Sequence, residues 1–298
     1  MGQKDLRQKL LEDYEDVFSD IFNGLLFGEN VIQKEYLYPG EIESVYKAAN
    51  RKYKGQYRDI LKEYRNECFL EVGALGIENQ TGYDKYISVR VMGYDYTKYR
   101  SQVDRKRKML LPVIIIVLNF SNYRWKDTKS LHKIMNIQKE LKEYVQNYEV
   151  KVFDIAFLED DVIERFTSDF KLIARFFKDK RLGKSHLFGE DKITHVEEFM
   201  DFLAVFTDDT RYTEIKESLV ELEKKGGEIQ MCRVAEELEK RGMERGMERG
   251  MEHGMERGEE ALAKLISKLM EAGRNESIQL VLVDKEARRR FYEEYNIV

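Results

Sequence analysis

Two acidic residues and a glutamine have the types and spacing needed to hold a divalent cation beside a phosphate. Glu78 and Gln80 end the segment GIENQ, and Asp59 stands earlier in YRDILKEY. Mg²⁺ takes oxygen ligands at about 2.0–2.1 Å and retains several waters. A bound ion of this kind polarises a phosphodiester and lowers the pKa of an attacking water. The amide of Gln80 can orient that water but has no pKa suitable for a base. These residues point to phosphodiester hydrolysis.

A strand predicted over Phe69 to Gln80 positions two of these side chains. Side chains alternate between the two faces of a strand, so Leu75 and Ile77 are expected to face a core. We expect the opposite face to be open, because it begins with two small residues; its members are Ala74, Gly76, Glu78 and Gln80. Asp59 approaches Glu78 if its own extended segment pairs with this strand.

A second interpretation of the same residues requires no chemistry. Polar residues commonly end a strand at a solvated sheet edge, and GIENQ fits that pattern. Asp59 follows Arg58, and a surface ion pair between them contributes at most about 1 kcal/mol. Residue types alone leave both interpretations open.

The surrounding pattern predicts an α/β fold with a helical C-terminal half. Leu110 to Phe120 is apolar on both faces, which is typical of a covered central strand. Further strands are predicted over Asn30 to Tyr38 and Val150 to Leu158. Helical periodicity marks the segments Asp5 to Phe27, Tyr83 to Arg100, Thr128 to Val145, Glu159 to Lys178, Ile193 to Thr207 and Tyr212 to Lys224.

A four-residue repeat, RGMERGMERGMEHGMERG, occupies Arg241 to Gly258. Each glycine costs a helix about 1 kcal/mol, and a period of four drifts around a helix of 3.6 residues per turn. A marginal helix or a frayed linker is therefore expected, acting as a spacer or as an oligomerisation helix that would give a homodimer. Two short helices are predicted over Glu259 to Tyr295. The expected domains are residues 1–160, 161–240, 241–258 and 259–298.

Composition excludes several classes of protein. Of 298 residues, 42% are hydrophobic and 12% aromatic, which excludes wholesale disorder. The two cysteines, Cys68 and Cys232, are too isolated for a disulfide framework or structural zinc, so a reduced cytoplasmic protein is expected. No signal core is present, and the longest apolar run is about a dozen residues, too short to cross a bilayer, so no membrane partner is expected. Phosphate-loop, dinucleotide-binding and serine-hydrolase motifs are absent from the sequence.

Binding to DNA requires a local basic patch, because the formal net charge is -5. The best candidate is KYRSQVDRKRK, Lys98 to Lys108, whose expected phosphate contacts are Lys98, Arg100, Arg105 and Arg107. A second basic run lies close to Asp59 and contains Arg51, Lys52, Lys54 and Arg58. A solvated basic loop is the alternative interpretation of the first run.

Three segments in order resemble the recombination-promoting nuclease (Rpn) family, also called the YhgA-like transposase family, within the PD-(D/E)XK nuclease superfamily. They are FSDIFNGLLFGENVI, YRDILKEY and LGIENQTGYDKYISVRVMGYDYTKYRSQ. The resemblance covers about the first 160 residues and extends to the repetitive tail. It implies a restriction-endonuclease-like mixed sheet flanked by helices. It also implies a metal-dependent DNA endonuclease linked to DNA recombination or mobile elements, with Mg²⁺ or Mn²⁺ as cofactor.

The resemblance also assigns roles to individual residues. Asp59 matches the first catalytic acid, Glu78 and Gln80 match an E-x-Q variant of the motif, and Asp20 is a third metal ligand from the first helix. Glutamine stands where the superfamily usually has lysine, which leaves the identity of the base open. Arg90 and Tyr94 lie one helical turn apart and are expected to face phosphate or the active site, or to form a structural hydrogen-bonded pair. The rival function is a nuclease-like fold that serves as a non-catalytic binding or assembly module.

Overall fold

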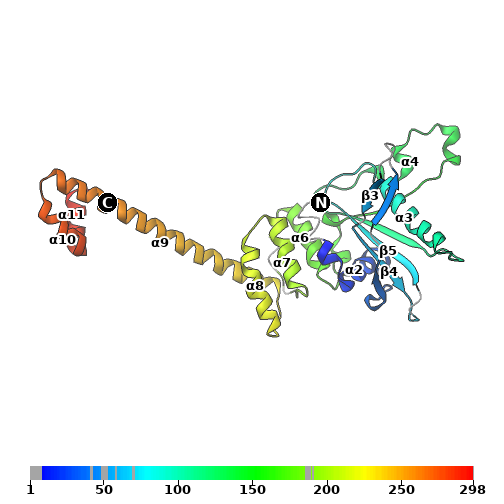
Figure 1. Ribbon diagram of the computed structural model, residues 1–298, viewed down its shortest axis with the longest axis horizontal. Coiled ribbons are helices and arrows are strands. Elements are labelled where there is room, and N and C mark those ends of the chain that lie inside the picture. The colour runs from blue at the N-terminus through cyan, green and yellow to red at the C-terminus, as the bar shows by residue number, and fades with distance from the viewer. Residues whose placement is uncertain are drawn as a thin grey trace. The chain divides into compact units, whose positions relative to one another are not determined.

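The computed structural model describes residues 9–40, 43–47, 53–57, 59–68, 71–184, 189 and 191–297, with only the backbone given for 43–47, 53–57 and 127. Figure 1 shows the chain coloured from its N-terminus to its C-terminus. The chain forms two compact units, residues 1–235 and 236–298. The first unit contains every candidate site residue named above.

A five-stranded mixed sheet forms the centre of the first unit. Its order is β1 (Leu37–Pro39), β4 (Ile60–Arg65), β5 (Glu71–Gln80), β6 (Val113–Asn119) and β7 (Lys151–Asp154). β1, β4 and β5 are antiparallel neighbours, whereas β5, β6 and β7 run parallel. A separate antiparallel ribbon joins β2 (Glu43–Lys47) to β3 (Tyr53–Tyr57). The α/β class is thereby confirmed.

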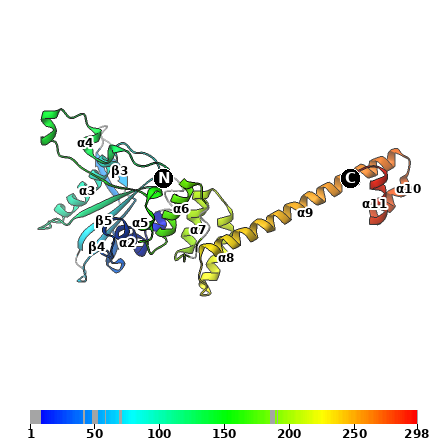
Figure 2. The same cartoon turned by 180° about the vertical axis from the view of Figure 1, so that it is seen from behind.

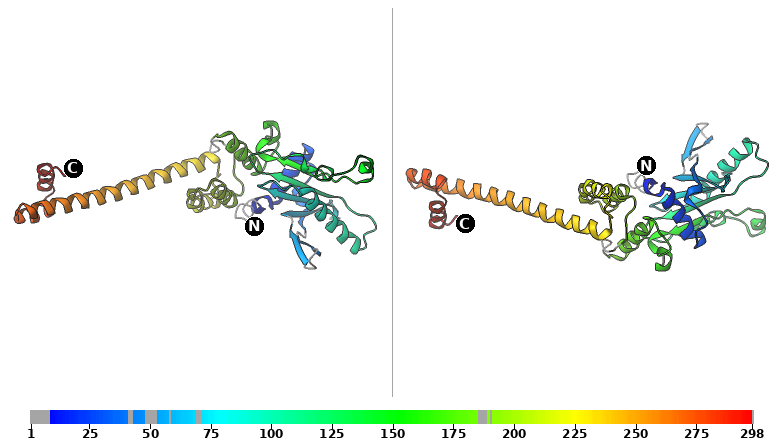
Figure 3. Two further views of the ribbon diagram at one scale, coloured as in Figure 1. Left: turned by 90° about the horizontal axis from the view of Figure 1, so that it is seen from above. Right: turned by 90° about the horizontal axis from the view of Figure 1, so that it is seen from below.

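Helices cover both faces of this sheet, and Figure 3 shows α2 and α3 on opposite sides of it. α3 (Ile87–Asp104) shares one apolar cluster with β6, made of Ile87, Val91, Tyr94, Ile115, Val117, Trp125 and Val150. α2 (Glu15–Phe22) lies on the other face, where the Phe18 ring lies 5.7 Å from the Lys62 ammonium of β4. α6 (Phe170–Leu182) packs there too, with the Phe177 ring 4.9 Å from Phe120.

The helical half of this unit continues with α7 (Val196–Thr207) and α8 (Arg211–Lys224). Aromatic rings join α6 to α7, with Phe177 5.2 Å from Phe206 and Phe176 5.5 Å from Phe202. The helical C-terminal half predicted from periodicity is confirmed, because these helices bury one apolar stripe each.

One predicted helix, Glu159 to Lys178, is wrong as a single element. The structure gives α5 (Asp160–Ile163), a break, and then α6. In the break, the backbone N–H groups of Thr167 and Ser168 donate to the Asp20 carboxylate. A side-chain acceptor on another helix thus replaces the helical carbonyls that those groups would otherwise require.

Two other predictions are corrected by local contacts. The strand expected over Asn30 to Tyr38 is confined to β1, because the Asn23 side chain accepts hydrogen bonds from the N–H groups of Val31 and Ile32 and holds that segment in a loop. The helix expected over Thr128 to Val145 is reduced to α4 (Leu131–Ile134) and a 3₁₀ turn, Lys139–Tyr144. Leu131 is the only buried residue between positions 131 and 144, all of which are described, so no apolar face stabilises a longer helix. The chain around α4 extends away from the sheet in Figures 1 and 2.

The second unit consists of the greater part of α9 (Met231–Glu271), with α10 (Asn275–Val283) and α11 (Lys285–Glu294). Leu265, Leu269 and Val281 form its small core, against which Phe291 and Tyr292 pack. The repeat Arg241 to Gly258 lies inside α9, so the structure shows the helix rather than the frayed linker. Its methionines are exposed; Met247, for example, retains 67% of its accessible area. None of the described helices is both long and apolar enough to cross a membrane.

Candidate active site

The end of β5 gathers the side chains that the sequence singled out. β5 pairs with β4 so that Ile77 faces Ile60, which places Asp59, the residue before β4, beside Glu78. On β5 itself, the Gln80 Nε2 donates a hydrogen bond to the Glu78 Oε1 at 3.2 Å. The prediction that Glu78 and Gln80 project side by side is therefore met by the structure, and antiparallel pairing brings Asp59 to the same end of the sheet.

Asp59 is fixed by two contacts of its carboxylate. Its Oδ2 accepts a hydrogen bond from the Asn79 N–H at 2.6 Å, and its Oδ1 lies 2.5 Å from the Lys9 Nζ. The two paired side chains are 13% and 12% exposed, so solvent reaches both. The carboxylate is held in place while remaining accessible to a small ion.

Glu78 is more deeply buried, which corrects the expectation of an open sheet face. Its side chain is 5% exposed, and the Arg90 Nη2 on α3 lies 2.7 Å from its Oε1. Arg90 also pairs with Asp84, at 3.3 Å. The small residue Gly76 does not open this face to water, because a Cβ there would already lie 3.2 Å from Ile115. Small side chains let neighbouring groups pack more closely, and α3 covers them.

This setting shifts two pKa values. Burial raises the pKa of Glu78 to about 7, and the nearby Asp59 carboxylate acts in the same direction, while Arg90 and a hydrogen bond with Tyr94 oppose the shift. Burial also raises the pKa of Tyr94, and the Glu78 charge adds to that rise. Tyr94 therefore stays protonated and donates to Glu78. Arg90 and Tyr94, one turn apart on α3, both face the same carboxylate.

The oxygen atoms of Asp59 and Glu78 fit a divalent cation. The Glu78 Oε2 is buried and has no hydrogen-bond partner among the described residues. An unsatisfied carboxylate oxygen beside a second carboxylate is an arrangement that a divalent cation would satisfy. No group of three or more His, Cys, Asp or Glu residues within the described part of the chain is arranged to hold a metal. Two carboxylates with remaining positions left to water fit Mg²⁺, which retains waters when bound.

A further acid near this site was missed by sequence reasoning. Glu12, in the helical segment 9–12, is fully buried, and the Asn79 Nδ2 donates a hydrogen bond to its Oε2. Asn79 thus bridges Glu12 and Asp59, one through its side chain and the other through its backbone. The spacing of Lys9 and Glu12 on one helical face is the signal that could have identified them.

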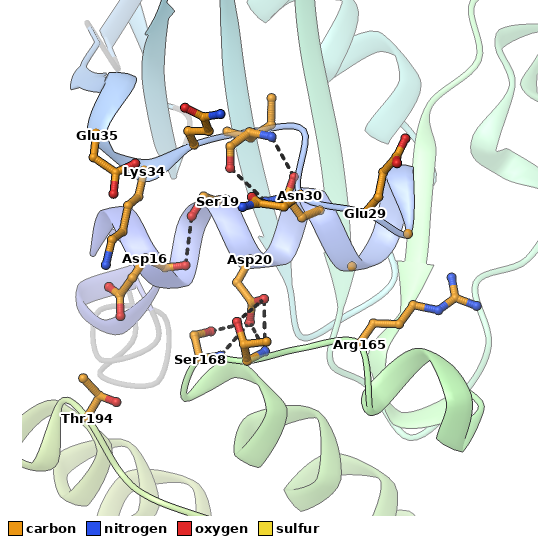
Figure 4. A pocket seen from close by; sticks show the side chains of 16 residues that line it. Asp16, Ser19, Asp20, Glu29, Asn30, Lys34, Glu35, Arg165, Ser168 and Thr194 are labelled. Carbon is orange, nitrogen blue, oxygen red and sulfur yellow. Dashed lines mark hydrogen bonds between the residues drawn. The ribbon is translucent and has the colours of Figure 1, made fainter.

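Asp20, predicted as a third ligand, lies elsewhere. Its carboxylate accepts five hydrogen bonds from the N–H and hydroxyl groups of Thr167 and Ser168, at 2.6 to 3.1 Å. Figure 4 shows Asp20 reaching down from α2 to Ser168. Both residues line a cavity of about 560 Å³. No hydrogen bond or ion pair among the described residues links it to Asp59 or Glu78. Its contacts join α2 to the helical half.

Three of the predicted phosphate contacts, Lys98, Arg100 and Arg107, are paired with carboxylates of the chain. Lys98 is buried and lies 2.9 Å from Glu63 and 3.7 Å from Glu71. Arg107 pairs with Glu71, and Arg100 pairs with Asp104 at 3.0 Å. The positive charge of Arg105 helps to lower the pKa of the Glu63 carboxyl. Of the second basic run, Arg51, Lys52 and Arg58 and the side chain of Lys54 lie outside the described residues. Lys98 and Arg107 are thus held by carboxylates of β4 and β5, and Arg100 by a carboxylate of α3 itself.

Comparison with known proteins gives one family match. Residues 68–210 match the model of a family described as "Putative transposase, YhgA-like". The matched range includes Glu78, Gln80, Arg90 and Tyr94 and begins after Asp59. Searches of curated proteins and of solved structures return no match. The family match supports the resemblance seen in the sequence over slightly less than half of the chain.

Proposed function

We propose that this chain is a metal-dependent DNA endonuclease of the PD-(D/E)XK class, with Asp59 and Glu78 as the metal ligands. The observation that carries the proposal is the antiparallel register of β4 and β5, which pairs Ile60 with Ile77 and so places Asp59 beside Glu78. The Asp59 charge adds to the burial that raises the pKa of Glu78 to about 7. The orphaned Glu78 Oε2 and the family match, whose name refers to transposition of DNA, support it. A role in DNA recombination or mobile elements belongs to the same proposal.

Each residue has a distinct part in this function. A bound divalent cation supplies Lewis-acid activation of the phosphodiester and of a water molecule. Asp59 and Glu78 provide the negative charge that retains the cation, and Tyr94 orients Glu78 through its hydrogen bond. Gln80 holds the Glu78 Oε1 at 3.2 Å and presents its amide to a bound water. Lys9 balances the charge of Asp59 in the cation-free chain.

The test is plasmid nicking with Mg²⁺ or Mn²⁺, compared between the native chain, Glu78→Ala and Asp59→Asn. Both substitutions should lower the nicking rate by about a hundredfold or more, because loss of a residue that merely supports a metal ligand already costs about 10- to 100-fold. Glu67→Ala, at an exposed turn after β4, is the matched acidic control and should leave the rate unchanged. Equal nicking by Glu78→Ala and the native chain would refute the proposal.

The second candidate is a nuclease-like fold that binds or assembles without catalysis. The Arg90 guanidinium already neutralises the buried Glu78, and this observation favours that candidate. Thermal unfolding with and without Mn²⁺ separates the two functions. A cation that binds only the folded chain adds about 2.7 kcal/mol of stability when its free concentration is a hundred times its Kd. An unchanged melting temperature at millimolar Mn²⁺, together with absent nicking, would favour the non-catalytic module.

A further inference from the structure

We propose that two loops beside the candidate site form a platform that stacks the unpaired bases of single-stranded DNA. The inference rests on the proposed function and specifies its substrate. The two loops, here called the edge loops, are residues 81–86 (TGYDKY) and 121–126 (SNYRWK). The first directly follows β5, and the second follows β6 after one intervening residue, Phe120.

The edge loops border Glu78 because of strand register. β5 ends at Gln80, which pairs in register with Asn119 at the end of β6, and the Phe120 N–H donates to the Gln80 carbonyl at 2.9 Å. Parallel strands release their following loops at one edge of a sheet, where ligands commonly bind. A strand of DNA whose phosphate reached Glu78 would therefore pass across these loops.

Both loops expose tyrosine rings. Tyr83, Tyr86 and Tyr123 retain 43%, 59% and 46% of their accessible area. The Tyr83 ring lies 5.4 Å from the ring of Trp125, which is itself buried in the cluster under α3. This contact joins the two edge loops and anchors one exposed ring to the core. Exposed aromatic rings at a sheet edge offer flat apolar surface that the core of the protein does not use.

The cations of the edge loops differ from Lys98, Arg100 and Arg107 of the predicted patch, which are paired with carboxylates. Lys85, Arg124 and Lys126 are exposed and form no ion pair with any described residue. The Lys85 ammonium lies 5.6 Å from the centroid of the Tyr86 ring, and the Arg124 guanidinium lies 4.9 Å from that of Phe157. Asp84, an acid of the first loop, is paired with Arg90. Positive charge here is available to phosphates, unlike that of Lys98.

The exposed rings and cations of the edge loops together favour single-stranded DNA over duplex DNA. Cations attract the phosphates of either form. Rings stack only on bases whose faces are free, and in a duplex those faces are covered by neighbouring base pairs. Surfaces that bind single-stranded nucleic acid combine exposed aromatic rings with cations that are free to contact phosphates, as the edge loops do. Binding through the edge loops would present an unpaired phosphodiester to Asp59 and Glu78.

The experiment measures fluorescence anisotropy of a labelled single-stranded DNA of about 12 nucleotides and of the matching duplex, in EDTA so that no cleavage occurs. The native chain should bind the single strand more tightly. Tyr86→Ala and Tyr123→Ala should each weaken single-strand binding by about fivefold or more, while duplex binding changes little. Tyr86→Phe and Tyr123→Phe keep the rings and should bind as the native chain does. Tyr144→Ala is the control, since Tyr144 is 75% exposed on the turn beyond α4.

Several outcomes would overturn the platform. These are equal binding of single strand and duplex, alanine variants that bind as the native chain does, or an equal loss in Tyr144→Ala. Each can occur while plasmid nicking remains dependent on Glu78, so the platform can fail without the nuclease. Conversely, binding that depends on the tyrosine rings supports the platform even if no variant nicks DNA. Thermal unfolding of each variant confirms that these exposed substitutions leave the fold intact.

Discussion

The Glu78 carboxylate lies 2.7 Å from the Arg90 guanidinium, and this contact joins the end of β5 to the helix that covers it. Burial and Asp59 raise the pKa of Glu78 to about 7, whereas Arg90 lowers it. The charge state of the proposed metal ligand therefore depends on a residue of a different element. At neutral pH, the carboxyl is divided between its protonated and charged forms.

The affinity for a divalent cation is expected to depend on pH through Glu78. The cation binds the deprotonated carboxylate, so binding releases a proton below the pKa of about 7. The Kd for Mn²⁺ should rise about tenfold for each pH unit below that value and level off above it. Arg90→Ala removes the charge that lowers the Glu78 pKa, so its transition should move to higher pH. Calorimetric titration from pH 5.5 to 8.5 checks both, and a pH-independent Kd would contradict them.

The free energy of unfolding should also depend on pH through Glu78. It should fall as pH rises, whereas the affinity for the cation should increase. A folded-state pKa of about 7, against 4.5 for an ordinary glutamate, means that the folded chain holds the proton more tightly. The free energy of unfolding that Glu78 contributes therefore falls as pH rises from about 4.5 to 7, by up to about 3 kcal/mol, and is constant above that range. Glu78→Gln removes the titration.

The measurement for this second prediction is urea unfolding of both proteins at several pH values without metal. Trp125 is the single tryptophan of the chain and is buried in the cluster under α3, so its fluorescence reports on the site's own unit. The stability of Glu78→Gln relative to the native chain should increase between pH 5 and 8. A constant difference would mean that Glu78 titrates near its ordinary pKa.

Sequence patterns predicted β5 and β6 because each strand buries a continuous run, and they predicted α3 although its buried face is partly polar. Strand alternation alone placed Glu78 beside Gln80. Sequence reasoning did not predict Lys9 and Glu12, because their roles arise from contacts between the first helix and the sheet. It expected an open face at Gly76, since alternation says which face a residue occupies but not what covers that face. Asp20 was assigned from its helix, yet its partners Thr167 and Ser168 come from a break that periodicity read as helix.

Lys98 is expected to stabilise the fold rather than to bind DNA. Its side chain is 8% exposed and lies between Glu63 and Glu71, so Lys98→Ala leaves two carboxylates without this partner. The free energy of unfolding should fall by about 3 kcal/mol, while the salt dependence of DNA binding stays the same. Arg100→Ala is the control, because its pair with Asp104 is 58% exposed on both sides and should change stability by less than about 0.5 kcal/mol. A lower salt slope for Lys98→Ala would return this residue to the DNA surface.

Substitutions of Asp20 and of Glu12 should have different effects, because Asp20 supports the fold whereas Glu12 lies near the proposed cation site. Asp20→Ala leaves the N–H groups of Thr167 and Ser168 without their acceptor, so unfolding should become easier by about 2 to 4 kcal/mol while the Kd for Mn²⁺ is unchanged. Glu12→Gln keeps a side chain of the same shape beside Asn79 but replaces a carboxylate oxygen with an amide nitrogen, in the contact that links Glu12 through Asn79 to Asp59. It should weaken Mn²⁺ binding by about tenfold, since groups that surround metal ligands contribute about that much. Weaker Mn²⁺ binding in a folded Asp20→Ala chain would instead show that the first helix supplies its acid from Asp20.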